Sequence, residues 1–443
     1  MILLRFTVRN HKSIRDEVTI EFLRPSLRTL RPKSGDWREH VYSLAGVFGP
    51  NASGKSAILD ALKYAFTAVH NSSTTWQGKS KMPRAPFRLD DHSRNEPSMF
   101  VLEFIRNDRR YEYGFEVDAD GVVREWLRDA PSRWRTLFDR HRDSGDIKVH
   151  PTLRAIGEVS ERELVLSRAR VVKHPQLGPI AADLTNSFDI VSVKDAHREV
   201  RLSDIAESLI EGSISPLDIE ALLQVADIGI REVTVEEKDL PEHIRRALQV
   251  FASAMNEKES SADKAEQKHE GELAELEAED SKQLVRNLLF THRGESSKCP
   301  PFSIAQESDG TIAWLALMVP VIETLRSGGL LCVDEIDSSL HPHLLDVVLG
   351  LFADPTLNRT GAQLLFTSHE TYVLSPLSEV QLEPEQVWFT EKSIVGVTEL
   401  GCLADFPRHS DANVAKRYLA GRYGGTPRLA PSILEALLVP EED

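Results

Sequence analysis

A glycine-rich octet near the start of the chain, Gly49–Ser56, carries the clearest chemical pattern in the sequence. It reads Gly49, Pro50, Asn51, Ala52, Ser53, Gly54, Lys55 and Ser56, and fits G-x-x-x-x-G-K-[ST]. In such a loop the glycines let backbone N–H groups surround phosphates, Lys55 supplies a positive charge to the β- and γ-phosphates, and Ser56 can bind Mg²⁺. The alternative is an ordinary glycine-rich turn.

The elements around this octet favour phosphate binding over a simple turn. An apolar run at Tyr42–Phe48 predicts a strand before it, and Ala57–Val69 has helical periodicity after it. The positive N-terminal end of that helix would point at a bound anion. We therefore expect a strand, a phosphate-binding loop and a helix in direct succession.

A second pattern lies near residue 330, where the apolar strand Gly329–Val333 ends in Asp334 and Glu335. A buried strand that ends in two carboxylates suggests a cation or a reacting water. Asp334 can hold Mg²⁺, and Glu335 can orient and polarise an attacking water. A helix N-cap would look similar, but the phosphate-binding loop makes the catalytic interpretation the stronger one.

Two more segments could contact an anion. His369 follows the predicted buried strand Gln363–Thr367, where a phosphate-binding fold places its γ-phosphate sensor; the alternative is a loop histidine. Ser308 and Gly310 precede the predicted helix Gly310–Leu325 and can offer a hydroxyl and free N–H groups. The alternative there is a plain N-cap.

The order of the predicted elements along the chain indicates an α/β fold with a parallel core sheet, because buried strands alternate with helices. Alternation in Phe100–Phe115, followed by an Asp-Gly turn at Gly121, predicts an antiparallel sheet beside the core. The region from Pro151 to Leu223 is mainly helical in pattern. Further strands are expected at Ile228–Val235 and Leu284–Thr291, and a helix at Leu344–Phe352.

The charge and the cysteine content of the chain narrow the classes of protein to which it could belong. The 443 residues carry a net charge of −16, which gives no general affinity for nucleic acid. An arginine-rich stretch at 124–148 is expected to be a solvated face, with nucleic-acid contact as the alternative. Three scattered cysteines, Cys299, Cys332 and Cys402, form no disulfide framework or zinc site. With no secretory start and no membrane-span pattern, we expect a cytoplasmic protein.

Together these motifs resemble the ABC ATPases of the SMC, RecF and OLD type, over residues 1–120 and 284–427. Under that resemblance the octet corresponds to Walker A, Glu307–Thr311 to the signature motif in an ESDGT form, Leu330–Glu335 to Walker B, Ile336–Leu340 to the D-loop and His369 to the switch histidine. A narrower similarity, to bacterial RloA-like ATPases of antiphage and restriction loci, rests on Phe302–Thr311, Ser338–Pro342, Gln363–His369, Val387–Lys392 and Lys416–Gly424. The Q-loop departs from the pattern, with Gln77 or residues 83–89 as candidates.

The resemblance implies a P-loop ATPase with ATP and Mg²⁺ as cofactors and Lys55, Glu335 and His369 as catalytic residues. It implies that Ser308 acts on ATP bound by a second copy, so that two chains form a head-to-tail homodimer or a higher oligomer. The expected division is an N-terminal lobe at 1–120, a mainly helical insertion at 121–283 with a polar run at 257–282, a C-terminal lobe at 284–427 and a tail at 428–443.

The resemblance implies a sensor or regulatory ATPase of antiphage defence that acts with a separate effector, because no nuclease-like or hydrolase-like residue group is evident in the sequence. The alternatives are a RecF-like repair ATPase that binds DNA directly, and a nucleotide-gated scaffold that does not hydrolyse ATP. The Glu335 carboxylate argues against the scaffold.

Overall fold

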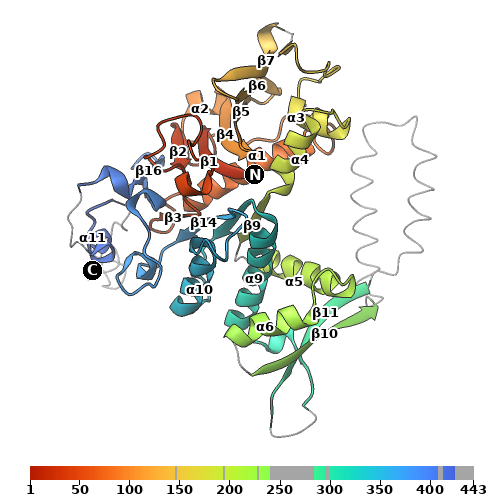
Figure 1. Ribbon diagram of the computed structural model, residues 1–443, viewed down its shortest axis with the longest axis vertical. Coiled ribbons are helices and arrows are strands. Elements are labelled where there is room, and N and C mark those ends of the chain that lie inside the picture. The colour runs from red at the N-terminus through yellow and green to blue at the C-terminus, as the bar shows by residue number, and fades with distance from the viewer. Residues whose placement is uncertain are drawn as a thin grey trace, which may run out of the picture. The chain divides into compact units, whose positions relative to one another are not determined.

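The structure is a computed structural model that describes residues 1–144, 147–192, 195–226, 229–239, 284–294, 299–407 and 413–424 (Figure 1). The predicted polar run at 257–282 and the predicted tail at 428–443 lie outside the described residues. The chain forms two compact units. The first consists of Met1–Val193 and Pro320–Asp443, and the second of Lys194–Val319. Each unit has a hydrophobic core of its own.

The first unit contains a six-stranded, mainly parallel sheet in the order β16-β15-β3-β14-β13-β9. Its strands are β3 (Leu44–Phe48), β9 (Phe188–Ser192), β13 (Leu330–Asp334), β14 (Gln363–Ser368), β15 (Val387–Lys392) and β16 (Thr398–Cys402). Every residue of the central strands β3 and β14 is buried, as expected for parallel strands covered on both faces. Only the β15–β16 pair is antiparallel. The predicted parallel core is confirmed.

The strand β9 is a correction to the sequence analysis, which expected mainly helix between Pro151 and Leu223. β9 lies at the edge of the core sheet and pairs in parallel with β13, from Phe188 opposite Leu330 to Ser192 opposite Asp334. Four of its five residues are only half-buried. A short edge strand of this composition has no strong alternating pattern, so its pairing with β13 decides its structure.

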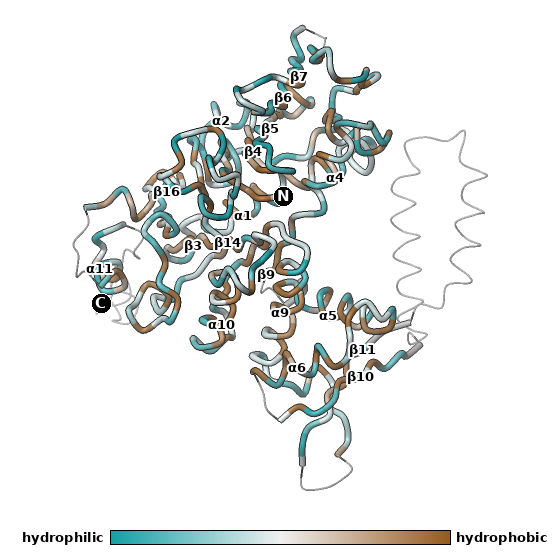
Figure 2. The backbone as a smooth tube through the Cα atoms, in the orientation of Figure 1, coloured by the Kyte–Doolittle hydropathy of each residue, from teal (hydrophilic) through white to brown (hydrophobic). Residues whose placement is uncertain are grey.

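Helix α1 (Lys55–Asn71) follows β3 and the phosphate-binding loop. The apolar face predicted for it, Ile58, Leu59, Leu62, Ala65 and Phe66, is at most 3 % exposed. The other long helices of the C-terminal part are α9 (Asp309–Ser327), which is mainly apolar along its length (Figure 2), and α10 (Pro342–Ala353). Shorter helices are α2 (Asp91–Asn95), α3 (Val165–Val171), α4 (Gly178–Asn186) and α11 (Val414–Leu419).

A second, antiparallel sheet in the first unit has the order β2-β1-β4-β5-β6-β7-β8. Its strands are β1 (Ile2–Arg9), β2 (Val18–Glu21), β4 (Ser98–Arg106), β5 (Arg109–Val117), β6 (Val122–Ala130), β7 (Arg135–His141) and β8 (Ile147–Val149). The predicted hairpin turn at Gly121 joins β5 to β6. Residues 122–149 thus continue this sheet. Within the predicted insertion at 121–283, the first α-helix, α3, begins only after β8.

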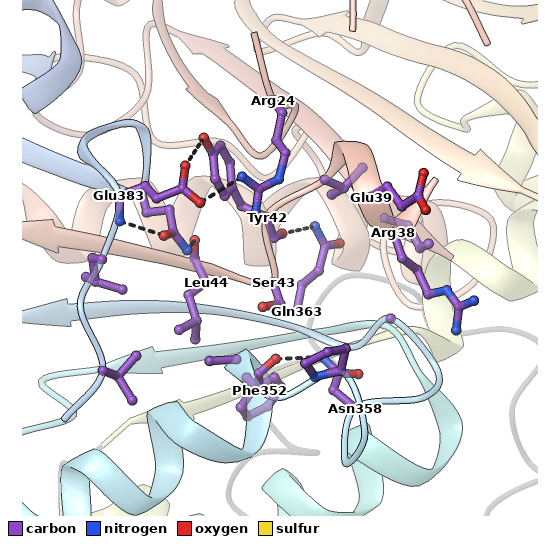
Figure 3. Close-up of a pocket in the computed structure, with 18 of the residues that line it drawn as sticks. Arg24, Arg38, Glu39, Tyr42, Ser43, Leu44, Phe352, Asn358, Gln363 and Glu383 are labelled. Atoms are coloured by element: carbon purple, nitrogen blue, oxygen red, sulfur yellow. Dashed lines mark hydrogen bonds and ion pairs between the residues drawn. The ribbon is translucent and has the colours of Figure 1, made fainter. Parts of the chain in front are cut away.

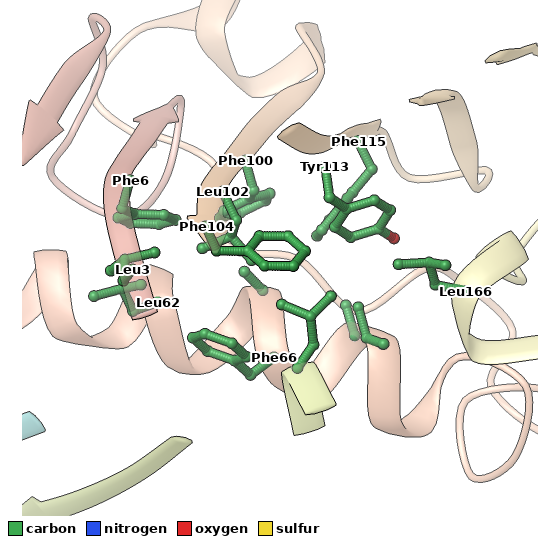
Figure 4. Close-up of a cluster of buried hydrophobic side chains, with 14 of the residues drawn as sticks. Leu3, Phe6, Leu62, Phe66, Phe100, Leu102, Phe104, Tyr113, Phe115 and Leu166 are labelled. Carbon is green, nitrogen blue, oxygen red and sulfur yellow. The ribbon is translucent and has the colours of Figure 1, made fainter. Parts of the chain in front are cut away.

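The core of this unit lies between the antiparallel sheet and α1 (Figure 4). Phe6, Phe100, Phe104 and Phe115 come from the sheet, and Phe66 comes from α1; each is at most 3 % exposed. Ring pairs such as Phe100–Phe115, with centroids 5.2 Å apart, add to the burial of apolar surface. This packing fixes α1, and therefore the loop at its N-terminus, against a rigid support.

The second unit consists of α5 (Asp195–Ile210), α6 (Pro216–Ala226) and a three-stranded antiparallel sheet of β10 (Ile230–Asp239), β11 (Leu284–His292) and β12 (Phe302–Ser303), with the first half of α9. Its core includes Leu202, Leu223, Phe290 and Leu315, all at most 2 % exposed. The two strands predicted for this region are confirmed. Among the described residues, no helix is long and apolar enough to cross a membrane.

Candidate active site

The phosphate-binding loop joins β3 to α1 in a conformation that requires glycine at its last turn. Gly54 is the N-cap of α1 with a φ of 109°, and Ala52 has a φ of 64°. A Cβ on Gly54 would lie 2.0 Å from Thr398 Oγ1, far inside a normal contact. The sequence pattern therefore corresponds to a real backbone constraint, because other residues rarely adopt such a φ and none would fit beside Thr398.

Lys55 opens α1 and folds back over the loop. Its Nζ donates to the carbonyl oxygens of Gly49 at 2.7 Å and Pro50 at 3.1 Å, and the residue is only 6 % exposed. Burial lowers the pKa of the Lys55 ammonium, and the carboxylates of Glu335 and Asp334 oppose that shift. The ammonium thus lies inside the loop, where phosphate oxygens can replace the carbonyls as its partners.

Ser56 and Asp334 come together although 278 residues separate them. Ser56 Oγ donates to Asp334 Oδ1 at 3.0 Å, and the same carboxylate oxygen accepts from Thr367 Oγ1 at 2.7 Å. An exposed hydroxyl beside a carboxylate is a donor set of hard oxygen ligands, which suits Mg²⁺ that keeps several waters and phosphate ligands. The residues present therefore fit the metal that the sequence pattern implied.

Glu335 stands at the end of β13 with an unusual backbone. Its φ is 56°, in the left-handed region that few non-glycine residues occupy. Its N–H donates to Thr367 Oγ1 at 2.7 Å, and the next N–H, that of Ile336, donates to the Thr367 carbonyl at 3.0 Å. Thr367 on β14 therefore holds both the carboxylate of Asp334 and the turn that presents Glu335.

His369 follows β14 and is exposed. Its Nε2 lies 3.7 Å from Asp337 Oδ2, a charge contact too long for a hydrogen bond. The Asp337 side chain is 6 % exposed, and within the described part of the chain its Oδ1 has no hydrogen-bond partner. Asp337 and His369 thus lie next to each other just beyond the acidic strand end.

Ser308 and Gly310 belong to the second unit, where Ser308 caps α9. Its Oγ accepts from the N–H of Thr311 at 3.1 Å, and its carbonyl accepts from Ile312 at 3.1 Å. The neighbouring residues are held as well. Glu307 contacts His292 at 2.7 Å, and Asp309 contacts Arg198 at 3.5 Å. The N-cap geometry that the sequence analysis gave as the alternative is therefore present at Ser308, and contact of this segment with an anion stays a prediction.

The Q-loop candidates are engaged in local contacts. The Gln77 amide donates to the Ser72 carbonyl at 2.5 Å and accepts from Ser160 Oγ at 3.2 Å. In the segment 83–89, the Ala85 carbonyl accepts from the Lys12 N–H, and the Phe87 N–H donates to Asn10 Oδ1. Gln77 therefore packs near the C-terminal end of α1, and the segment packs on the loop after β1.

Sequence analysis missed the threonines that surround the site. Thr367, Thr390 and Thr398 are each at most 1 % exposed, and all three direct a hydroxyl at a residue of the site. No local pattern marks such residues, since a lone threonine in a strand is usually a structural residue.

A separate cavity of about 590 Å³ lies at the opposite, N-terminal edge of β3 and β14 (Figure 3). Its polar groups satisfy one another. Gln363 bonds to both backbone groups of Leu3 and to the Tyr42 carbonyl, and Arg24 pairs with Glu383 at 2.7 Å. This cavity contains none of the residues predicted for the site, and it lies away from the phosphate-binding loop.

A buried strand, a glycine-rich loop, a helix that begins with lysine and serine, and a second strand that ends in an acidic pair define a P-loop nucleotide-binding protein. The protein family described as "AAA domain, putative AbiEii toxin, Type IV TA system" matches residues 44–375. The chain belongs to this family and is a P-loop ATPase of that type.

Solved structures with a similar fold include an SMC head bound to the C-winged helix domain of ScpA, with 14 % identity, a TM-score of 0.44, and coverage of 91 % of this chain and 97 % of that one. The SMC head domain from Thermotoga maritima has 12 % identity, a TM-score of 0.39, and coverage of 91 % and 99 %. The recombination mediator protein RecF-ATPrS of the RecFOR pathway has 13 % identity, a TM-score of 0.36, and coverage of 90 % and 97 %. Similarities of this size indicate no substrate or partner. No curated protein matches the chain.

Proposed function

We propose that the chain binds Mg-ATP at Gly49–Ser56 and hydrolyses it with Glu335. The observation that carries this proposal is the 3.0 Å contact between Ser56 Oγ and Asp334 Oδ1, which joins the phosphate-binding loop to the acidic strand end. Both lie at the carboxyl ends of parallel strands, β3 and β13, which flank β14 in the sheet, and α/β sheets bind their ligands at such an edge.

In this proposal each residue of the site has its own role in phosphoryl transfer. Lys55 binds the β- and γ-phosphates, and Ser56 with Asp334 holds the metal, which when bound neutralises charge that develops on the phosphates. Glu335 lies next to Asp334 and orients the attacking water. His369 contacts the γ-phosphate, and Asp337 supports it from 3.7 Å away. Lys55 exchanges its two carbonyl partners for phosphate oxygens.

We further infer that hydrolysis takes place between two copies of the chain. Each chain has one phosphate-binding loop and one ESDGT segment, so a two-fold, head-to-tail pair would have two complete sites. Ser308 and Gly310 at the N-terminus of α9 would approach the γ-phosphate that Lys55 of the other copy holds. The N-terminus of the 19-residue α9 carries the positive end of the helix dipole, which would favour the approach of an anion.

In the cell we propose a cytoplasmic regulatory ATPase of antiphage defence, of the RloA-like branch, that acts with a separate effector. The sequence resemblance supports this role, and the family description names a putative toxin of a toxin–antitoxin system. The insertion at 121–283 would carry the specificity for the trigger. Co-purification of a product from a neighbouring gene supports an effector; growth arrest by this chain alone would instead identify it as the toxin.

Direct DNA binding of the RecF kind finds less support in the structure. In the arginine-rich stretch 124–148, four of the arginines pair with carboxylates: Arg124 with Asp139, Arg128 with Glu112, Arg135 with Asp129 and Arg142 with Asp118. Phosphate contacts require basic groups that are free to release counterions. The stretch is therefore better described as a cross-strand ion-pair network.

The test is a steady-state assay of the full chain with ATP and Mg²⁺, beside a nucleotide-binding measurement. We expect Mg²⁺-dependent hydrolysis that EDTA abolishes. Lys55→Ala should lose nucleotide binding, whereas Glu335→Gln should bind ATP and lose at least about a hundredfold in kcat. Wild-type turnover in the Glu335 variant would show that this carboxylate does not orient the water.

A further inference from the structure

The hairpin formed by β15 and β16 presents two buried threonine hydroxyls to the phosphate-binding loop. Thr390 in β15 pairs with Leu400 in β16, and Thr398 lies two residues before Leu400. Directly paired residues and residues two apart point to the same face of a hairpin. Both threonines therefore face the loop, and both are at most 1 % exposed.

The two hydroxyls converge on one residue of the loop, Ser53. Thr390 Oγ1 lies 2.6 Å from Ser53 Oγ and 3.3 Å from the Phe48 carbonyl. Thr398 Oγ1 lies 2.9 Å from the Ser53 carbonyl and 2.8 Å from Ser13 Oγ. The side chain and the main chain of Ser53, itself 1 % exposed, are thus both held by the hairpin.

Two glycines allow the hairpin to approach so closely. A Cβ on Gly49 would lie 2.3 Å from Thr390 Oγ1, and a Cβ on Gly54 would lie 2.0 Å from Thr398 Oγ1. The absence of a side chain at these two glycines is therefore what admits the threonine hydroxyls.

We infer that Thr390 and Thr398 are positioning residues for nucleotide binding, and that the hairpin holds the loop in its phosphate-accepting conformation before ATP arrives. A glycine-rich loop would otherwise lose conformational entropy when it closes around phosphates, and prior order removes that cost from binding. Both threonines, like Ser13, lie outside residues 44–375, which the family match covers. This inference rests on the proposed ATP binding.

Isosteric substitutions distinguish the effect of losing the hydroxyl from the effect of changing the side-chain shape. In Thr390→Val and Thr398→Val the buried hydrogen bonds are lost, and we expect the Kd for ADP and ATPγS to rise about tenfold in each. The KM for ATP should rise with it while kcat stays within about twofold of wild type. Thr390→Ser and Thr398→Ser, which keep the hydroxyl, should restore wild-type affinity.

The matched control is Thr7→Val in β1. Thr7 is also buried, and its Oγ1 lies 2.8 Å from Thr19 Oγ1, in the antiparallel sheet. We expect this variant to bind nucleotide as wild type does. Isothermal titration gives the Kd values, and thermal unfolding without nucleotide gives the stability of each variant.

Valine variants that are less stable but bind nucleotide with wild-type Kd would overturn the inference, because the threonines would then only stabilise the fold. If the valine variants do not fold, Ser13→Ala decides the matter. It removes a hydroxyl from the half-buried end of the same network, so a severalfold rise in Kd supports the inference and an unchanged Kd overturns it. A wild-type chain that binds no ATP would instead refute the proposed function itself.

Discussion

Thr367 joins the two functions of the acidic strand end at the scale of single residues. Its hydroxyl donates to Asp334, the proposed metal ligand, and accepts from the N–H of Glu335, the proposed water-orienting residue. The Glu335 φ of 56° persists because such contacts outweigh the strain of that conformation. One side chain on a neighbouring strand therefore sets the positions of two groups proposed to act in catalysis.

This geometry makes Thr367→Val a sharp test. The variant keeps the side-chain shape but frees Asp334 and the Glu335 turn, so kcat should fall about ten- to a hundredfold, as for other residues that orient metal ligands. Thr367→Ser should retain most of the activity. Steady-state kinetics at saturating Mg²⁺ measure both, and a Thr367→Val variant with wild-type kcat would contradict the assigned role.

Local spacing explains which site residues the sequence could reveal. The octet Gly49–Ser56 and the pair Asp334–Glu335 each form a pattern among immediate neighbours, and the structure places them in contact. Thr367, Thr390 and Thr398 are isolated in the sequence, and their contacts with the loop or the strand end arise only from the order of strands in the sheet. The spacing of residues along the sequence does not show which distant residues these threonines contact.

At the scale of elements, the antiparallel sheet supports α3 through one buried carboxylate. Leu164, the N-cap of α3, provides no side-chain cap. Glu125 of β6 takes that role, because its carboxylate accepts from the N–H groups of Val165 at 2.7 Å and Leu166 at 3.2 Å, and from Tyr113 OH at 2.9 Å. The first turn of the helix therefore depends on a residue 40 positions away.

Burial raises the pKa of Glu125 from 4.5 to about 7, despite opposition from the N–H donors and Arg140. The folded protein therefore retains a proton that the unfolded chain releases near pH 4.5, so this group's contribution to stability is full below that pH and is lost as the pH rises towards 7. The contribution amounts to about 3 kcal/mol at most.

Glu125→Gln should remove this dependence, since its side chain stays neutral. The difference in unfolding free energy between wild type and variant should therefore favour wild type most below pH 4.5 and shrink towards pH 8. Denaturant titrations at several pH values measure it, and the other acidic groups cancel in the difference. A difference that does not change with pH would mean that Glu125 is already ionised in the folded protein at pH 5.

Helices and strands with a strong hydrophobic pattern in the sequence were predicted well, and those without such a pattern were not. The central strand at 44–48 is a continuous apolar run, the strand at 363–368 has an apolar centre at 364–366, and α1 has a full apolar face. The edge strand β9 has neither feature, since Asp189 and Ser192 interrupt it. Its strand structure depends on β13, which lies more than 130 residues later in the sequence.

At the scale of the whole molecule, the chain divides its ATPase motifs between two units. Lys55, Asp334 and His369 belong to the first unit, and Ser308 and its cap at the start of α9 belong to the second. The count of motifs, one of each, is a property of the sequence. Whether a second copy completes each site, as proposed, depends on an association surface that no spacing rule describes.

Mixing two inactive variants tests this assembly. Lys55→Ala should bind no ATP, and Ser308→Arg should bind ATP without turnover, because arginine would block the approach of the signature segment. In a mixed head-to-tail pair, the intact loop of the Ser308→Arg chain meets the intact signature of the Lys55→Ala chain, so one of the two sites is complete. Random exchange at equal amounts makes about half of the pairs mixed, which predicts recovery of about a quarter of wild-type hydrolysis.

Each variant mixed with itself is the control. Full turnover by Ser308→Arg alone, or no recovery on mixing despite proven pair formation, would exclude a site shared between chains.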